Sequence, residues 1–335
     1  MHVLSQTLGE VLLDWFRRVA RRLPWRETKD PYAIWISEIM LQQTRVEAVI
    51  PYFERFLERF PSAAVLAAAP EEEVLTMWGG LGYYSRARNL QQAARMVAER
   101  GRFPETYEEI LALPGVGEYT AAAVASIAFG LPYAVLDGNV MRVMSRVTCD
   151  FGDIGSLATR NRLRDAAQRC LPPGEAGDTN QALMELGATL CLPRDPHCLL
   201  CPLAAHCRAR AEGVQNELPT KLRRPATVAV ETALLLIEEE GRILMRQSAS
   251  GGRMAGFWEL PEADAMPGVA ATEEAHRFRH SIMNRAYRCT VYRAKLPGPA
   301  EPPPAGYRWI ERSRLPNLPI STMAKKALQM GSRDR

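Results

Sequence analysis

The sequence predicts a multidomain protein in which an all-α part, residues 1–210, precedes a small α+β domain, residues 228–335. Apolar residues recur at helical spacing through most of the first part, with no sustained alternation. A cysteine cluster closes that part, and short β-type runs begin near Val228. The length of 335 residues is sufficient for two domains.

The first part consists of helical segments separated by turns rich in glycine and proline, such as WGGLGYY, LPGVG and LPPGEAGD. The first helix is predicted from the spacing of Leu8, Val11, Leu12, Trp15, Phe16 and Val19, and Pro24 ends it. Further helices are predicted over 35–48, 51–59, 71–77, 85–100, 107–112, 118–128, 138–148, 160–170 and 179–190.

A polar stretch interrupted by prolines, residues 211–227, is typical of a linker. Beyond it, strands are predicted in VAVETALLLI, RILMRQ, FWELP, CTVYRAKL and YRWIE. A helix in STMAKKALQM closes the domain. The alternation of short strands with a final helix indicates an α+β fold.

The composition is that of a globular protein with substantial cores, at 47% hydrophobic and 24% charged residues. The sequence has neither a bilayer-length apolar run nor a signal-peptide pattern, which predicts a cytoplasmic protein without a membrane partner and with reduced thiols. Residues 1–210 carry 23 Lys and Arg against 24 Asp and Glu, so any phosphate-binding surface is a local patch. Twenty-two of those 23 cations are arginines, which suits bidentate phosphate contacts but also follows from a G+C-rich genome.

Four of the seven cysteines, Cys191, Cys198, Cys201 and Cys207, are spaced C-x6-C-x2-C-x5-C. Four thiolates this close suit a tetrahedral zinc ion or an iron–sulfur cluster. Zinc sites usually contain two CxxC pairs, whereas only one is present here. The longer gaps favour a loop wrapped around a [4Fe–4S] cube; zinc and an empty reduced site are the alternatives.

A possible phosphate site lies at LPGVG, where Gly115 and Gly117 form a tight turn before an alanine-rich helix. Backbone N–H groups at such a turn can bind an anion without reading sequence. A GxG turn alone is weak evidence, because most such turns only reverse the chain.

Two carboxylates are candidate catalytic groups. Glu38 lies among apolar residues in WISEIMLQQT, and Asp137 precedes a helix in LDGNV. A carboxyl group in an apolar pocket has a raised pKa and can act as an acid. The simpler interpretations are a surface residue of an amphipathic helix for Glu38 and an N-cap for Asp137.

The motifs WxSExMLQQT, GLGYY, LPGVG, LDGNV and the cysteine loop occur in the order found in adenine-specific mismatch DNA glycosylases of the MutY type. The chain resembles this family, part of the endonuclease III helix-hairpin-helix superfamily, over residues 8–210 and more weakly beyond. The resemblance implies a six-helix barrel with the hairpin over about 23–134. It also implies an iron–sulfur cluster domain made of 1–22 and 135–210.

The resemblance implies a role for each motif. Glu38 would protonate adenine and Asp137 would stabilise the cationic sugar, with Tyr119 and Asn139 hydrogen-bonded around them. The flipped adenine would be held by Trp25, Arg26, Leu41, Val46 and Gln181. DNA would be contacted by Gln43, Thr44, Leu81, Tyr83, Gly115 and Gly117. Core packing remains an alternative for the apolar members of these sets.

Tyr119 stands where the bifunctional members of the superfamily have a Schiff-base lysine. A phenol cannot form an iminium with the sugar, so the resemblance implies a monofunctional hydrolase with absent or weak lyase activity. The expected partner is double-stranded DNA with adenine opposite 8-oxoguanine or guanine, and we expect a monomer.

Residues 228–335 resemble a Nudix-like module, but the segment after FWELP lacks the glutamate-rich helix that binds magnesium in active Nudix hydrolases. In the glycosylase family this module reads 8-oxoguanine through a loop centred on Phe-Ser-His. The corresponding residues here are Phe278, Arg279 and His280. An arginine side chain can only donate hydrogen bonds, whereas a serine oxygen can accept one from the N–H that distinguishes 8-oxoguanine from guanine.

Three rival functions stay open on the sequence. The protein could be a glycosylase for another base, a damage-binding module without catalysis, or a Nudix hydrolase with a helical appendage. Glu38, Asp137 and Gln181 argue against the first. The paired carboxylates argue against the second, and the missing metal-binding helix argues against the third.

Overall fold

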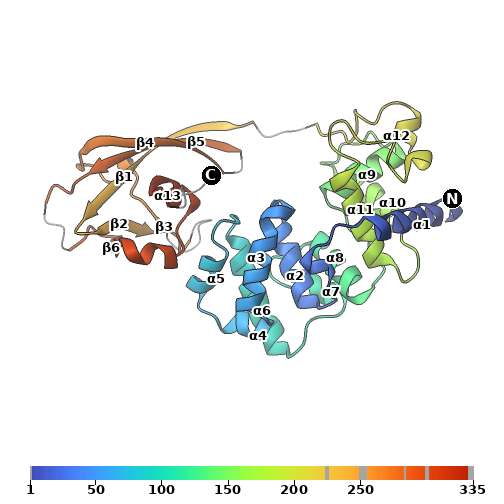
Figure 1. The fold of residues 1–335 in the computed structure, drawn as a ribbon, viewed down its shortest axis with the longest axis horizontal. Coiled ribbons are helices and arrows are strands. Elements are labelled where there is room, and N and C mark those ends of the chain that lie inside the picture. The colour runs from blue at the N-terminus through green and yellow to red at the C-terminus, as the bar shows by residue number, and fades with distance from the viewer. Residues whose placement is uncertain (1, 223–225, 249–254, 283, 299–301, 331–335) are drawn as a thin grey trace. The chain divides into compact units, whose positions relative to one another are not determined.

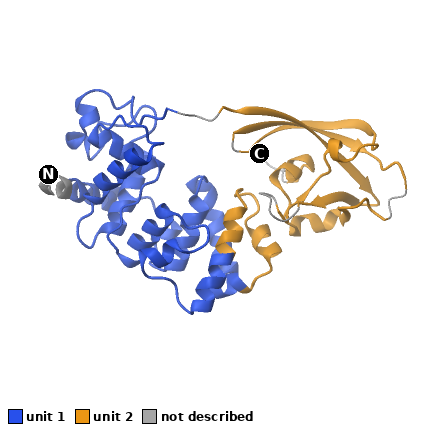
Figure 2. Cartoon of the chain, turned by 180° about the vertical axis from the view of Figure 1, so that it is seen from behind, with its two compact units in different colours: residues 1–67, 92–224 blue, residues 68–91, 225–335 orange. Residues whose placement is uncertain are grey.

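The computed structural model describes residues 2–222, 226–248, 255–282, 284–298 and 302–330 (Figure 1). The chain divides into two compact units. Unit 1 comprises residues 1–67 and 92–224, and unit 2 comprises 68–91 and 225–335 (Figure 2). Within the described ranges, no helix is both long enough and apolar enough to cross a bilayer.

Helices account for the regular structure up to residue 211, as the sequence predicts. They are α1 His2–Val19, α2 Pro31–Leu41, α3 Val46–Arg59, α4 Ala63–Ala68, α5 Glu71–Met77, α6 Ser85–Arg100, α7 Tyr107–Leu111, α8 Glu118–Phe129, α9 Gly138–Thr148, α10 Leu157–Gln168, α11 Ala176–Thr189 and α12 Arg208–Ala211. Short 3-10 turns lie at Pro24–Arg26 and Ala204–His206.

The core of unit 1 is formed by α2, α8, α9 and α11, which pack on one another. Helix α2 is buried along nearly its whole length, and Asp30 caps its start by accepting from the backbone N–H groups of Tyr32 and Ala33. A close approach joins α11 to α9, because a Cβ on Gly187 would lie 2.5 Å from the Cβ of Asn139. This contact brings the first turn of α9 against the later turns of α11.

The predicted helix over 35–48 is wrong in one respect that matters for function. Helix α2 ends at Leu41 and α3 begins at Val46, with a turn over 42–45. Gln43 has a left-handed backbone (φ 58°), and the Gln42 side chain donates to Thr120 Oγ1 at 3.2 Å. The four residues of the turn, QQTR, carry no large apolar side chain, and the contact from Gln42 to Thr120 ties the turn to α8. Helix α4 was not predicted, because its six residues are too few for a periodic pattern.

Unit 2 contains a mixed sheet with the strand order β3-β2-β1-β5-β4, and β6 also pairs with β2. Its elements are β1 Val228–Glu239, β2 Arg242–Gln247, β3 Trp258–Glu259, β4 Ala271–Ile282, β5 Arg285–Ala294, β6 Tyr307–Glu311 and helix α13 Thr322–Ala327. Strands β1 and β5 run parallel from Val228↔Arg285 to Ile237↔Ala294. The predicted α+β fold of this region is confirmed, apart from β4.

Phe278, Arg279 and His280 lie within strand β4. The loop conformation expected for them is therefore wrong, while their role in lesion recognition stays a prediction. Alternation along a strand puts the middle residue on the opposite face from its neighbours. Phe278 packs against the core cluster next to α13, and burial lowers the pKa of the half-buried His280. Arg279 is exposed. The long β4–β5 pairing stabilises this arrangement.

Candidate active site

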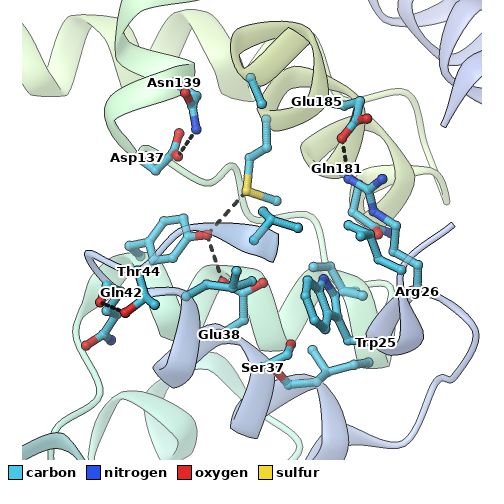
Figure 3. Close-up of a pocket in the computed structure, with 18 of the residues that line it drawn as sticks. Trp25, Arg26, Ser37, Glu38, Gln42, Thr44, Asp137, Asn139, Gln181 and Glu185 are labelled. Atoms are coloured by element: carbon cyan, nitrogen blue, oxygen red, sulfur yellow. Dashed lines mark hydrogen bonds and ion pairs between the residues drawn. The ribbon is translucent and has the colours of Figure 1, made fainter. Parts of the chain in front are cut away.

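A cavity of about 530 Å³ in unit 1 gathers the predicted catalytic and adenine-binding residues (Figure 3). The predicted residues that line it are Trp25, Arg26, Glu38, Leu41, Gln43, Thr44, Val46, Tyr119, Asp137, Asn139 and Gln181. They come from the 3-10 turn before α2, from α2 and the turn after it, from the first residue of α3, from α8, from the N-cap and first turn of α9, and from α11. Segments separated by up to about 150 positions in the sequence thus share one cavity.

Glu38 is the buried carboxyl group of this cavity, with 4% of its surface exposed. Burial raises its pKa to about 7, although the hydrogen bond from Tyr119 opposes the shift. The Tyr119 hydroxyl donates to Glu38 Oε2 at 2.7 Å and lies 3.2 Å from Met184 Sδ. A carboxyl group with a pKa near 7 can donate a proton at neutral pH, and Glu38 lines the cavity.

Asp137 is the second carboxyl group, and it caps α9. Its Oδ1 accepts from the Val140 backbone N–H at 2.7 Å, and its Oδ2 accepts from Asn139 Nδ2 at 2.9 Å. Burial raises its pKa, while these hydrogen bonds act in the opposite direction by favouring the charged form. The N-cap interpretation and the catalytic one are thus compatible, since one oxygen caps the helix while the residue lines the cavity.

A third carboxylate, Glu185, was missed by the sequence reasoning. Arg21 binds both of its oxygens, at 2.7 and 2.9 Å, and Arg26 Nη2 donates to Oε2 at 2.9 Å. Burial alone would raise the pKa of Glu185, but the two arginines lower it. The signal that could have found it is spacing, because Gln181 and Glu185 are four residues apart on one face of α11. Glu185 holds Arg26 at the cavity wall.

The predicted DNA-contacting residues are distributed over both units. Gln43 and Thr44 line the cavity, while Leu81 and Tyr83 lie on the segment 68–91 of unit 2. Gly115 has a left-handed backbone (φ 77°), and Gly117 precedes α8 as its N-cap. Nothing lies within 4 Å of a Cβ placed on Gly117. The hairpin therefore presents open backbone at the start of α8.

The four clustered cysteines line one cavity, and none forms a disulfide. Arg146, which is nearly fully buried, donates to Cys191 Sγ at 3.2 Å and to the Leu192 carbonyl at 2.7 Å. In the described part of the chain, no three His, Cys, Asp or Glu side chains surround a single point closely enough to hold one ion. Four soft thiol donors beside a buried guanidinium fit a negatively charged thiolate–metal group.

Helix α9 links this cysteine loop to the Asp137 carboxylate. Arg142 donates through Nε to the Cys191 carbonyl at 2.7 Å and through Nη2 to Asn139 Oδ1 at 2.9 Å. That contact orients the Asn139 amide so that its nitrogen faces Asp137. The cysteine loop and the Asp137 side chain are thus joined by consecutive hydrogen bonds.

Family comparisons agree with both parts of the architecture. Residues 36–169 match the model of the HhH-GPD superfamily base excision DNA repair proteins, and residues 232–330 match that of the NUDIX domain. The human protein named adenine DNA glycosylase is 34% identical over 95% of this chain and 73% of its own length. The mouse protein of the same name is 33% identical over 95% of this chain and 76% of its own.

Solved structures match the helical part. A thermostable thymine-DNA glycosylase is 31% identical and aligns with 62% of this chain and 97% of its own, with a TM-score of 0.55. A trapped endonuclease III–DNA covalent intermediate is 24% identical and aligns with 64% of this chain and 98% of its own at a TM-score of 0.54, which shows the shared fold alone.

The fold and the carboxylate-lined cavity thus define a DNA glycosylase of the helix-hairpin-helix superfamily. Because the similarity to the adenine glycosylases extends through the C-terminal domain, the chain belongs to the adenine DNA glycosylase family.

Proposed function

We propose that the protein removes adenine from DNA by hydrolysing its N-glycosidic bond. The observation that carries the proposal is the pair of carboxyl groups on one cavity: Glu38, which is buried and has a pKa raised to about 7, and the partly exposed Asp137. A proton donor and a charge stabiliser are what N-glycoside cleavage requires, since adenine leaves poorly until it is protonated.

The residues divide the chemistry as follows. Glu38 transfers its proton to a ring nitrogen of adenine, and the bond to the sugar breaks with its electron pair on the base. Ionised Asp137 stabilises the positive charge that develops on the sugar. Water then adds to the sugar carbon, and its proton passes to Glu38. Asn139 and the Val140 N–H support Asp137 in its charged form.

A duplex base cannot reach this buried cavity without leaving the helix, so adenine enters it flipped. Trp25, Leu41 and Val46 supply apolar walls, and Gln181 and Arg26 supply polar groups for the base. Tyr119 is committed to Glu38 by its hydrogen bond. With no amine at that position to attack the sugar, we propose that the enzyme is monofunctional.

We further propose that the Nudix-like domain contacts the base opposite adenine, with a preference for 8-oxoguanine. Arg279, exposed on β4, is the residue that replaces the family's serine there. The domain boundaries 1–210, 211–227 and 228–335, a monomeric state and a cytoplasmic location complete the proposal.

Base release from duplexes carrying adenine opposite 8-oxoguanine, guanine and thymine tests the function. We expect free adenine from the first two duplexes, and faster release opposite 8-oxoguanine. Release of thymine from a guanine–thymine duplex, with none of adenine, would instead assign the chain the activity named for its thymine-glycosylase neighbour. Equal adenine release opposite 8-oxoguanine and guanine would remove the lesion preference only.

We also propose that Cys191, Cys198, Cys201 and Cys207 hold a [4Fe–4S] cluster, with zinc as the alternative. Such a group, when bound, would pin the loop beside α9, where Arg142 and Arg146 hold its first cysteine. Metal analysis of the purified protein distinguishes the two. About four iron atoms and four acid-labile sulfides per chain are expected for the cube. One zinc per chain without iron would select the tetrahedral site.

A further inference from the structure

The wedge loop, defined here as residues 78–84, is built into the same compact unit as the C-terminal sheet. Residues 68–91 cluster with 225–335 although more than 130 positions separate them in sequence (Figure 2). The family resemblance assigns Leu81 and Tyr83 of this loop to DNA. Residues 68–91 belong by sequence to the helical part, but they pack within unit 2. A change in the packing of unit 2 can therefore change the conformation of the wedge loop.

Arg86 stabilises the wedge loop by contacting its backbone carbonyls and its aromatic rings. Its Nη2 donates to the carbonyls of Leu81 and Gly82, both at 3.1 Å, and its guanidinium lies over the rings of Trp78 and Tyr83. Tyr83 is 40% exposed and has a left-handed backbone (φ 48°). A non-glycine residue keeps such a conformation only where its surroundings enforce it. The loop is thus a constrained structure that presents one aromatic ring to solvent.

The other side of the loop is anchored on the Nudix-like domain. Tyr84 is 3% exposed, and its ring lies on that of Phe257, which is fully buried, with centroids 3.7 Å apart. The Tyr84 hydroxyl is 3.5 Å from Thr322 Oγ1, at the start of α13. Next to this pair, a Cβ on Gly256 would lie 3.5 Å from Leu75 Cδ1. Adjacent residues 83 and 84 therefore point to solvent and into the C-terminal domain, respectively.

We propose that Tyr84 and Phe257 are a pair of positioning residues through which the Nudix-like domain holds the wedge loop in the conformation that contacts DNA. The proposal rests on the proposed function, which gives Leu81 and Tyr83 their contact with the duplex. It assigns the C-terminal domain a second task, besides contact with the opposite base. Loss of the pair lowers base release whatever the opposite base is, because the loop then adopts its DNA-contacting conformation less often.

A double-mutant cycle on the full-length protein tests the pair. Tyr84→Leu and Phe257→Leu are each expected to slow single-turnover adenine release about tenfold, opposite guanine and opposite 8-oxoguanine alike. Because the two rings act through one contact, the double variant is expected to be no slower than the slower single variant. A loss of about a hundredfold in the double variant, or unchanged rates in the single ones, would overturn the proposal. Tyr84→Phe keeps the ring and loses only the 3.5 Å contact with Thr322 Oγ1, so it should slow adenine release far less than Tyr84→Leu.

Amide hydrogen exchange supplies a readout that does not depend on activity. Exchange over residues 78–84 is expected to accelerate in Phe257→Leu, and in Tyr84→Leu should the first variant fail to fold. Phe56→Leu is the matched control, since Phe56 is buried against Phe60 in unit 1 with centroids 4.8 Å apart. That variant should lose stability without faster exchange in the loop. Unchanged loop exchange in both unit 2 variants contradicts the coupling, whereas a wild-type protein that releases no adenine contradicts only the proposed function.

Discussion

Replacing Glu38 by Gln is expected to lower adenine release by about 10³-fold or more, while binding to the mismatched duplex changes little. The amide keeps the shape and the hydrogen bond from Tyr119 but has no acidic proton to give. Single-turnover base release and duplex affinity, measured on the same preparation, check the result. Release within a few-fold of wild type would remove Glu38 from the mechanism. Glu54→Gln, an exposed substitution on α3, is the matched control.

The raised pKa of Glu38 also predicts that the free energy of unfolding depends on pH in the wild-type protein and that Glu38→Gln removes this dependence. Its folded-state pKa, about 7, exceeds the ordinary value of 4.5, so the folded state binds a proton more tightly than the unfolded state. The resulting stability is present below pH 4.5 and is lost as the pH rises to about 7, a change of about 3 kcal/mol. Glu38→Gln should lack this component when the free energy of unfolding is compared at pH 5 and pH 8. Parallel profiles for the two proteins would show that the carboxyl has an ordinary pKa.

Asp137→Asn is the second substitution with a large expected effect, again about 10³-fold or more on adenine release. Asparagine caps helices about as well as aspartate, so α9 should keep its start at Gly138. The neutral amide, however, cannot stabilise a cationic sugar, and its nitrogen meets the Asn139 amide where an oxygen accepted before. The free energy of unfolding should therefore fall only modestly while the rate falls greatly.

Asp30→Asn provides the matched control for that prediction. Asp30 caps α2 through the backbone N–H groups of Tyr32 and Ala33, and it does not line the cavity. The same chemical change at this N-cap should leave adenine release nearly unchanged. If Asp137→Asn were equally harmless, the carboxylate at 137 would be a helix cap and no more.

Much of the fold could be predicted because it depends on local patterns. Helices α5, α6 and α9 and strands β2 and β6 have the predicted bounds, since apolar periodicity and turn residues mark their ends. The break over 42–45 and the strand at β4 could not be predicted in the same way. The first depends on Gln42 meeting Thr120, and the second on a ten-position ladder with β5.

The candidate site likewise contains residues that sequence motifs predict and residues whose place depends on tertiary contacts. Motif order brought Glu38, Asp137 and Tyr119 forward as candidates, and the structure places all three on one cavity. Glu185 was missed because its function depends on Arg21 and Arg26, more than 150 positions away in the sequence. Residues 68–91 and 225–335 form one compact unit, and no pattern in the sequence of either segment predicts that they pack together.

The sequence by itself determined which chemical groups this protein possesses: the two carboxyl residues in their motifs, the phenol in place of a lysine, and four thiols at a spacing suited to a metal cluster. Only the tertiary structure decided what those groups can do. A pKa depends on burial and on neighbours brought close by folding, which is why Glu38 differs from the exposed glutamates of the same chain. Residue type is a local property of the chain, whereas reactivity arises from contacts between distant segments.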